Sequence, residues 1–351
     1  MPSSKPIAQV IRKLTVKGKN VLAADESKKT VTERFERKGI PPTDENIRLY
    51  REWIVTTPGL ERYVSGIILF KETLEQAGSH GKPFVETLHE KGIVIGVKSD
   101  EGLYKPAGWG ENITQMESPR KLLETLKRYR ETHGVQFTKC RSLFSIGPNT
   151  PSNRAIDING AMMALDALVS LEAGLFPIVE PEVERAGTHT IDQCSSYAIA
   201  VYSRLNEKLR QYGAAISDVG IKTNFTVQGA DCGGTIPPRE VAKMTFQALA
   251  KGFGFYGVES ISIFFMLSGG LDDLPSGQYL HELNRFVEKG PFAKEKTFMA
   301  SYSRAMLDKA LDVWAGNPRN VEKAQKKLLE RAKAFSEARQ GRLDVKDYNW
   351  A

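Results

Sequence analysis

Residues 220–225 read Gly220-Ile221-Lys222-Thr223-Asn224-Phe225, an apolar and β-branched run entered through a glycine. Such a run predicts a buried strand. A lysine stands in its middle, and a buried ammonium is costly unless it is paired or loses its proton. A lysine without its proton is a nucleophile that forms Schiff bases with carbonyl groups. The simpler interpretation of Lys222 is a strand-end lysine with its stem packed and its ammonium in water, so the rest of the chain must decide.

Runs of the same kind recur about eight times along the chain, with helical patterns between most of them. They are 21–24, 64–70, 93–98, 137–144, 176–179, 220–225, 258–265 and 297–302. The clearest helical patterns are 154–174, 191–212 and 238–251. Strand and helix repeated in this way predict an α/β protein with a (β/α)8 barrel, a TIM barrel. A doubly wound open sheet is the alternative, but it asks for a glycine-rich loop after an early strand, and residues 23–27 contain no glycine.

The size of the chain suits one barrel. It has 351 residues, of which 41% are hydrophobic and 26% charged, and single α/β barrels reach this length. No internal linker rich in proline, glycine or serine is visible, so we expect a single domain over 1–351. Its additions are a basic amphipathic helix within 1–19, a charged C-terminal helix over 319–340, and a flexible tail over 341–351 that has no period.

Charge and cysteine usage exclude several classes of protein. The net charge is +7, but no Lys/Arg run is dense enough to make nucleic acid the main partner. Three widely spaced cysteines argue against a disulfide framework and a structural zinc site, and for a reducing, cytoplasmic location. Five scattered histidines argue against a metal site built mainly on histidine. No 18-residue apolar stretch and no signal peptide is present, so we expect no membrane association. We expect neither a metal nor another cofactor.

Charged side chains gather where the predicted strands end. Lys98 and Asp100, Lys139 and Arg141, and Glu180 and Glu182 are spaced i, i+2, so both members of each pair face the same way. The full set is Asp25, Lys98, Asp100, Lys139, Arg141, Glu180, Glu182, Lys222 and Arg304. Each desolvated ion costs several kcal/mol unless it is paired, and barrel enzymes build their sites from these strand ends. We therefore predict an active site here, in which neighbouring lysines lower the pKa of Lys222 and the carboxylates move protons.

Two further features point to phosphate groups. Ser268-Gly269-Gly270 follows the seventh run, where bare backbone N–H groups can hold an anion, although such a sequence alone is usually a turn. Ser27 and Thr30 lie near Arg34 in the sequence, and we expect them beside Lys98. Two anion pockets on opposite sides of the mouth suit a bisphosphate.

With these residues in view, the chain resembles the class I fructose-bisphosphate aldolases, the metal-free family that works through a Schiff base. The similarity extends from about residue 17 to residue 341. The stretches that carry it are Leu22-Ala23-Ala24-Asp25-Glu26-Ser27, Gly66-Ile67-Ile68-Leu69-Phe70-Lys71-Glu72-Thr73-Leu74, Gly96-Val97-Lys98-Ser99-Asp100, Lys139-Cys140-Arg141, Pro177-Ile178-Val179-Glu180-Pro181-Glu182, Lys222-Thr223-Asn224, Leu267-Ser268-Gly269-Gly270 and Ser301-Tyr302-Ser303-Arg304-Ala305.

The resemblance implies reversible cleavage of fructose 1,6-bisphosphate to dihydroxyacetone phosphate and glyceraldehyde 3-phosphate, in glycolysis and gluconeogenesis. It implies that Lys222 forms the imine, that Glu180 moves the protons of imine formation, and that Asp25 takes the proton of the C4 hydroxyl. The remaining catalytic residues are Lys139, which holds charge beside the imine, and Glu182. The resemblance also implies that the C1 phosphate is bound by Ser268, Gly269, Gly270 and Arg304. The other phosphate is bound by Ser27, Thr30 and Lys98. Further substrate contacts come from Arg34 and Arg141.

In the resembling family a C-terminal tyrosine folds over the barrel mouth and helps to protonate the enamine, and Tyr348 is the nearest candidate here. The chain departs from the family at four places. Lys28-Lys29-Thr30 stands for Thr-Gly-Ser, Ser303 for a glycine, Thr223 for a proline found in many members, and Asn349-Trp350-Ala351 for a terminal tyrosine.

Two other functions stay open at this point. One is another Schiff-base barrel enzyme, a lyase or a transferase of the transaldolase type. The other is a basic protein that binds acidic filaments or nucleic acid, as a pI of about 9.1 allows. For the aldolase we expect a homo-oligomer, a dimer or a tetramer.

Overall fold

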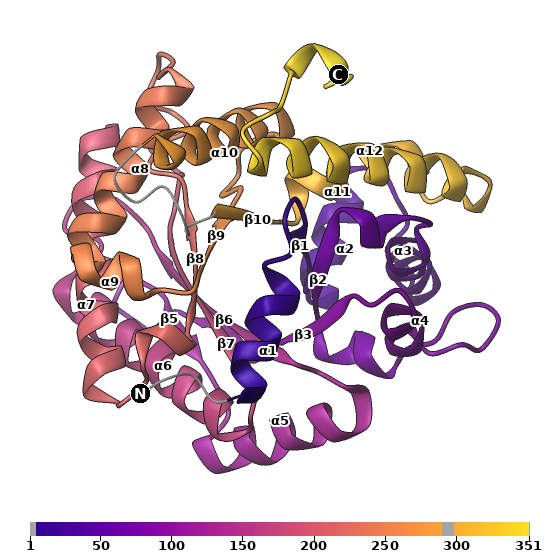
Figure 1. Cartoon of the computed structure of the whole chain (residues 1–351), viewed down its shortest axis with the longest axis horizontal. Coiled ribbons are helices and arrows are strands. Elements are labelled where there is room, and N and C mark those ends of the chain that lie inside the picture. Colours follow the sequence, from indigo (N-terminus) through magenta and orange to yellow (C-terminus); the bar gives the residue numbers. More distant parts are fainter. Residues whose placement is uncertain (1–4, 290–297, 351) are drawn as a thin grey trace.

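A closed barrel of eight parallel strands forms the centre of the computed structural model, which describes residues 5–289 and 298–350 (Figure 1). The strands follow the order β1-β10-β9-β8-β7-β6-β3-β2 around the barrel. The predicted (β/α)8 fold is thereby confirmed. The barrel strands are β1 (Asn20–Ala24), β2 (Val64–Leu69), β3 (Val94–Lys98), β6 (Phe137–Phe144), β7 (Phe176–Val183), β8 (Gly220–Asn224), β9 (Ile263–Leu267) and β10 (Phe298–Tyr302).

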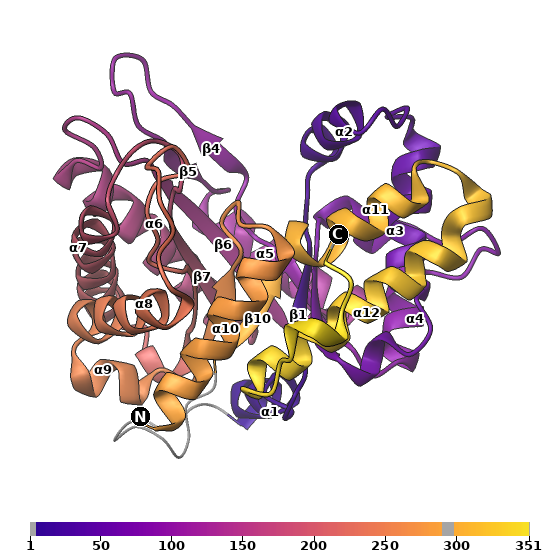
Figure 2. The ribbon, with the colours of Figure 1, turned by 90° about the horizontal axis from the view of Figure 1, so that it is seen from above.

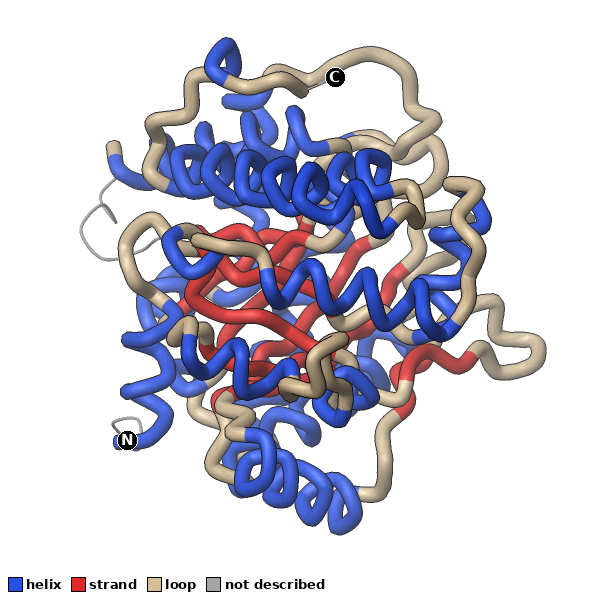
Figure 3. The backbone as a smooth tube through the Cα atoms, turned by 90° about the vertical axis from the view of Figure 1, so that its right-hand side faces the viewer, coloured by secondary structure: helices blue, strands red, loops and turns tan. Residues whose placement is uncertain are grey.

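Helices surround the barrel, and the view from the side shows them as a layer around the strands (Figure 3). Several begin where sequence signals place a start: Thr190 and Gln193 form a capping box on one, and Ser152 accepts a hydrogen bond from the Ala155 N–H on another. The helices are α1 (Lys5–Leu14), α2 (Lys28–Arg37), α3 (Asp44–Thr56), α4 (Phe84–Glu90), α5 (Pro119–His133), α6 (Asn153–Glu172), α7 (Ile191–Gln211), α8 (Pro238–Phe253), α9 (Phe255–Ser260), α10 (Asp273–Glu288), α11 (Arg304–Trp314) and α12 (Val321–Arg339).

Aromatic rings fill the barrel interior because glycines on the neighbouring strands leave room for them. A Cβ atom added at Gly96 would lie 2.2 Å from the ring of Phe137, and one added at Gly220 would lie 3.0 Å from the ring of Phe176. Helix α1 closes the amino end of the barrel by packing Ile7, Val10 and Leu14 on this interior cluster (Figure 1). The carboxyl ends of the strands are therefore the face left for a substrate.

The seventh predicted run, 258–265, is wrong at its start. Residues up to Ser260 belong to helix α9, and the strand begins only at Ile263. A short apolar run does not distinguish a buried helix from a buried strand, and the buried Val258 fits both. Thr297, the predicted start of the eighth run, lies outside the described residues. A two-stranded hairpin of β4 (Gly102–Tyr104) and β5 (Ile113–Gln115), which the sequence pattern did not predict, follows β3.

The tail packs on the helices α10 and α12 (Figure 2). The backbone N–H of Leu343 donates to Nδ1 of His281 on α10 at 3.1 Å, and the indole N–H of Trp350 donates to the carbonyl of Val345 at 2.8 Å. The guanidinium of Arg331 on α12 lies 4.5 Å from the centre of the Trp350 ring. The described part of the tail is thus tied to the outer layer by named contacts. Within the same described residues, no helix is both long and apolar enough to cross a membrane.

Candidate active site

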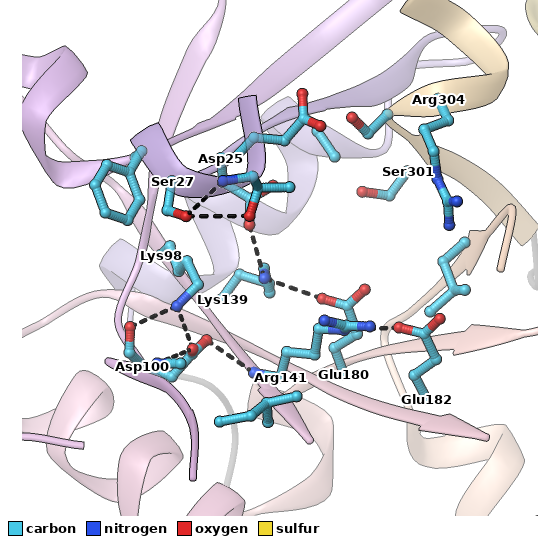
Figure 4. A pocket seen from close by; sticks show the side chains of 18 of the residues that line it. Asp25, Ser27, Lys98, Asp100, Lys139, Arg141, Glu180, Glu182, Ser301 and Arg304 are labelled. Atoms are coloured by element: carbon cyan, nitrogen blue, oxygen red, sulfur yellow. Dashed lines mark hydrogen bonds and ion pairs between the residues drawn. The ribbon is translucent and has the colours of Figure 1, made fainter. Parts of the chain in front are cut away.

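A cavity of about 700 Å³ opens at the carboxyl ends of the barrel strands (Figure 4). All nine charged residues predicted from the strand ends line it, together with Ser27, Thr30, Ser268 and Gly269. Eight of the nine come from β1, β3, β6, β7 and β8 or the residues just after them, and Arg304 opens helix α11. The barrel closure therefore brings together groups that are far apart in the sequence.

Lys139 stands at the centre of the charged groups. Its side chain is buried, and its ammonium lies 2.7 Å from Oδ2 of Asp25 and 3.1 Å from Oε2 of Glu180. Burial alone would lower the pKa of Lys139, but the carboxylates of Asp25 and Glu180 outweigh it, so the pKa is raised. Lys139 is therefore a permanent positive charge between two carboxylates.

Lys222 is buried next to the same group. Its ammonium lies 3.1 Å from Oε1 of Glu180, so Glu180 bridges the two lysines with one oxygen for each. The side chain of Lys222 is 4% exposed, which contradicts the simpler interpretation of a strand-end lysine with its ammonium in water. A buried amine within hydrogen-bond reach of a carboxylate is the arrangement of an activated nucleophile and its base.

The two carboxylates next to Lys139 are held in their charged forms. Burial would raise the pKa of Asp25, but Lys139 and Lys222 outweigh it and lower the pKa to about 2. Burial likewise opposes ionisation of Glu180, and Lys139, Lys222 and Arg141 lower its pKa nevertheless. At neutral pH both carboxyl groups are therefore ionised, which is the form that can accept a proton.

Two further ion pairs flank this centre. The guanidinium of Arg141 contacts Glu182 at 2.7 Å, and the ammonium of Lys98 contacts the carboxylate of Asp100. Asp100 also accepts hydrogen bonds from the backbone N–H groups of Gly102 and Arg141, at 2.9 and 3.0 Å. Pairing of this kind is what makes so many desolvated charges tolerable in one place.

Groups suited to phosphate lie on opposite sides of the cavity, with Ser27 and Lys98 on one side and Arg304 on the other (Figure 4). Ser27 caps helix α2, where its hydroxyl accepts from the Thr30 N–H at 3.3 Å, and helix N-termini favour anions. Arg304 forms no ion pair within 5–289 and 298–350, so its charge is available. Gly269 and Gly270 both have positive φ values, 56° and 85°, a conformation that glycine adopts without strain.

Three predicted site residues either do not line the cavity or are occupied by other side chains. Gly270 belongs to the loop beside the cavity but does not line it. Arg34 reaches the cavity edge, yet its buried guanidinium is engaged by Glu26 at 2.6 Å and Asp308 at 2.9 Å, so it is not free for a phosphate. Tyr348 is absent from the lining, and its hydroxyl donates to Glu337 on α12 at 2.6 Å. A catalytic Tyr348 therefore requires the tail to leave α12, which stays a prediction.

Other lining residues escaped the sequence reasoning. Ser301 and Ser303 reach the cavity from the end of β10, and Lys29, Glu33 and Arg37 from helix α2. Their spacing in the sequence could have indicated them. The two serines are spaced i, i+2 at a strand end, and the other three are spaced i, i+4, i+8 along one helix face. Within the described ranges, no cluster of three His, Cys, Asp or Glu side chains could hold a metal ion.

Comparisons with known proteins show similarity over nearly the whole chain. The family model described as class-I fructose-bisphosphate aldolase matches residues 6–350. A cytosolic fructose-bisphosphate aldolase of Arabidopsis thaliana is 36% identical over 348 residues, covering 95% of this chain and 86% of that protein. A chloroplastic aldolase of Chlamydomonas reinhardtii is 38% identical over 332 residues, 94% and 84% of the two chains. The solved aldolase of Plasmodium falciparum, in complex with TRAP and a small-molecule inhibitor, has a TM-score of 0.89 at 32% identity, over 97% of this chain and 95% of that one.

Proposed function

The chain belongs to the class I fructose-bisphosphate aldolases, and we propose that Lys222 is the residue that forms the Schiff base of its reaction. The reaction is the reversible cleavage of fructose 1,6-bisphosphate to dihydroxyacetone phosphate and glyceraldehyde 3-phosphate, a carbon–carbon lyase step of glycolysis. The observation that carries the proposal is the buried amine of Lys222, 3.1 Å from Glu180. The family match over residues 6–350 favours the aldolase over a transaldolase-type enzyme and over a protein whose main role is binding.

Lys222 and Glu180 carry out imine formation. Transfer of one ammonium proton to the carboxylate leaves a neutral amine, whose lone pair attacks the C2 carbonyl of the ketose. A proton passes from the attacking nitrogen to the resulting oxyanion, which gives the carbinolamine. Its hydroxyl then takes a proton from Glu180 and leaves as water, and a protonated imine remains. Because Glu180 contacts the amine directly, one group can accept the first proton and donate the second.

Asp25 is the base for cleavage of the C3–C4 bond. Its carboxylate accepts the proton of the C4 hydroxyl, a carbonyl forms at C4, and the bonding electrons move into the protonated imine to give an enamine. Lys139 lies 2.7 Å from that carboxylate and keeps it charged until the substrate arrives. A fixed positive group beside the reacting atoms stabilises charge without reorganising during the step.

The two phosphates orient the sugar. We assign the C1 phosphate to Arg304 with the Ser268–Gly269 backbone, and the distal phosphate to Ser27, Thr30 and Lys98. Charge-assisted hydrogen bonds at both ends hold the carbon chain across the cavity, so that C2 meets Lys222. Arg141 and Glu182, which pair at 2.7 Å, remain as a further substrate contact and a further carboxylate.

The test is borohydride reduction in the presence of dihydroxyacetone phosphate, followed by mapping of the modified peptide. We expect one stable adduct, on Lys222, and none in Lys222→Ala. Lys289→Ala, which removes an exposed lysine at the end of α10, is the matched control and should be trapped as in the natural chain. An adduct on another lysine, or continued trapping of Lys222→Ala, overturns the assignment.

We also propose a cytoplasmic homo-oligomer, a dimer or a tetramer, that needs no metal. All three cysteines are free thiols, which fits a reducing compartment. Light scattering measures the mass of the assembly. Exhaustive chelation should leave the activity unchanged, and loss of activity that zinc restores would contradict the metal-free mechanism.

A further inference from the structure

The strand that carries Lys222 pairs with its two neighbouring strands over different lengths. Strand β9 pairs with all five residues of β8, from Gly220 to Asn224. In the described structure, strand β7 pairs with β8 only at Gly220 and Ile221. The backbone ladder to β7 therefore ends one residue before Lys222, on the side from which Glu180 reaches the amine.

A side-chain hydrogen bond holds β8 from behind at this point. Side chains alternate along a strand, so Thr223 faces the helices while Lys222 faces the cavity. The hydroxyl of Thr223 is hydrogen-bonded to the hydroxyl of Tyr202 on helix α7. Thr223 and Tyr202 are 0% and 1% exposed, and neither lines the cavity.

Tyr202 is itself fixed in place. Its ring stacks on Phe253 of α8 with the ring centres 5.4 Å apart and the planes at 13°. A Cβ atom added at Gly252 would lie 2.5 Å from the Cβ of Tyr202, so the two helices are in close contact there. The amide of Asn206 donates to the carbonyl of Phe253 at 2.9 Å. The packing of α7 on α8 therefore fixes the position of the Tyr202 hydroxyl on the helix side of β8.

A second polar contact is made one residue further along β8, at Asn224. The side-chain carbonyl of Asn224 accepts a hydrogen bond from the backbone N–H of Val183 at 2.9 Å, which joins β8 to β7 beyond the end of their ladder. The two residues that follow Lys222 thus each make a side-chain contact, Thr223 to α7 and Asn224 to β7.

We propose that Tyr202 is a positioning residue for Lys222. Through Thr223 it sets where the strand holds the amine relative to Glu180, and it does so without touching substrate. The inference rests on the proposed role of Lys222 as the imine-forming residue. Because the pair lies behind the strand, its loss affects formation of the imine and leaves substrate binding unchanged.

The experiment removes each hydroxyl with little change of shape, in Tyr202→Phe and Thr223→Val. We expect kcat for fructose 1,6-bisphosphate, and the rate of borohydride-trappable imine formation with dihydroxyacetone phosphate, to fall about tenfold, since small misplacements of reacting groups are costly. KM should stay within about twofold, because uniform binding is not altered. Thr223→Ser keeps the hydroxyl and should restore the natural kcat. The double variant should be no slower than the slower single variant, because both remove one interaction.

Natural values of kcat and of the trapping rate in both folded single variants, or equal losses in Thr223→Ser and Thr223→Val, overturn the proposal. Should Thr223→Val fail to fold, Tyr202→Phe removes the same bond from the helix side and its split between kcat and KM decides. Failure of the proposed function is a distinct result, namely an adduct on a lysine other than Lys222.

Discussion

The ammonium of Lys139 lies 2.7 Å from the carboxylate of Asp25, so strand β6 is joined to strand β1 across the barrel mouth, with β3 and β2 between them in the sheet. Because Glu180 contacts both Lys139 and Lys222, the four groups form a row of alternating sign. A proton that moves from Lys222 to Glu180 changes the charge of both groups, while Lys139 stays positive between Glu180 and Asp25. The row therefore ties proton transfer to the positions of four strands.

Replacement of Lys139 by Met should shift the pH dependence of the enzyme. Without the ammonium, burial acts on Asp25 and Glu180 with less compensation, so the pKa of each carboxyl rises. We expect the acid limb of the kcat/KM profile to move to higher pH and kcat to fall at least about tenfold. Profiles measured from acid to alkaline pH test this. Lys139→Arg keeps the charge and should shift the limb less, and an unchanged limb in Lys139→Met would contradict the coupling.

Replacement of Lys98 by Ala should weaken substrates that carry a distal phosphate. A charge-assisted contact contributes about 1.5–3 kcal/mol, so kcat/KM for fructose 1,6-bisphosphate should fall at least about tenfold. The fall for fructose 1-phosphate should be much smaller.

The control for this prediction follows from the ion pair between Lys98 and Asp100. Removing Lys98 alone leaves a buried carboxylate without its partner, so Lys98→Ala is also measured together with Asp100→Asn. The preference for fructose 1-phosphate should persist in the double variant. Equal losses on the two substrates would show that Lys98 has another role.

The barrel and its charged mouth could be predicted because both depend on short-range rules. Parallel strands buried on two faces read as nearly continuous apolar runs, as in β3 (Val94–Lys98). Residues spaced i, i+2 on a strand share a face, and this spacing alone predicts that Lys139 and Arg141 lie at the same barrel mouth. Helix α9 was missed because its buried Val258 has the same apolar signal as a strand residue.

The pairing within the site could not be predicted, because it depends on how far the strands are staggered when the barrel closes. Nothing local to Lys139 indicates that Asp25 is its nearest carboxylate. Tyr202 gives no sequence signal that separates it from the apolar residues that α7 also buries, such as Val201 and Leu205, and its contact with Thr223 depends on the packing of that helix on β8. The contact of Tyr348 with Glu337 is likewise a property of the packed tail.

Asp166 should make the stability of the protein depend on pH. It is fully buried on α6, where the Ser99 hydroxyl donates to it at 3.0 Å, and burial raises its pKa from 3.8 to about 7. Between these two values the unfolded chain has lost the proton that the folded chain keeps. The contribution of Asp166 to the free energy of unfolding is therefore fully present below about pH 4 and is lost as pH rises towards 7, by about 4 kcal/mol in total.

Asp166→Asn removes this dependence. Relative to the natural chain, the variant should gain about 2–3 kcal/mol of unfolding free energy between pH 5 and pH 8. Urea unfolding at the two pH values measures the gain. Glu172→Gln, which changes an exposed carboxylate at the end of the same helix, is the matched control and should show little dependence. The same difference between Asp166→Asn and the natural chain at both pH values would contradict the raised pKa.

The last prediction concerns the tail and its tyrosine. The hydroxyl of Tyr348 donates to Glu337 at 2.6 Å, outside the cavity, so it can protonate the enamine only after leaving α12. We expect deletion of residues 342–351 to slow turnover of fructose 1,6-bisphosphate and the exchange of tritium from dihydroxyacetone phosphate, while borohydride still traps Lys222. Tyr348→Phe should reproduce both losses, because it removes the acid and keeps the ring.

Glu337→Gln separates release of the tail from its chemistry. It exchanges a charged acceptor for a neutral one, which weakens the docked contact, and it leaves the Tyr348 hydroxyl in place. Exchange of tritium in this variant should be at least as fast as in the natural chain. Thermal unfolding of each variant accounts for the packing that truncation removes, since Leu343 is buried against the outer helices. Full-rate exchange in the stable truncated enzyme would show that the tail has only the structural role seen in its contacts with α10 and α12.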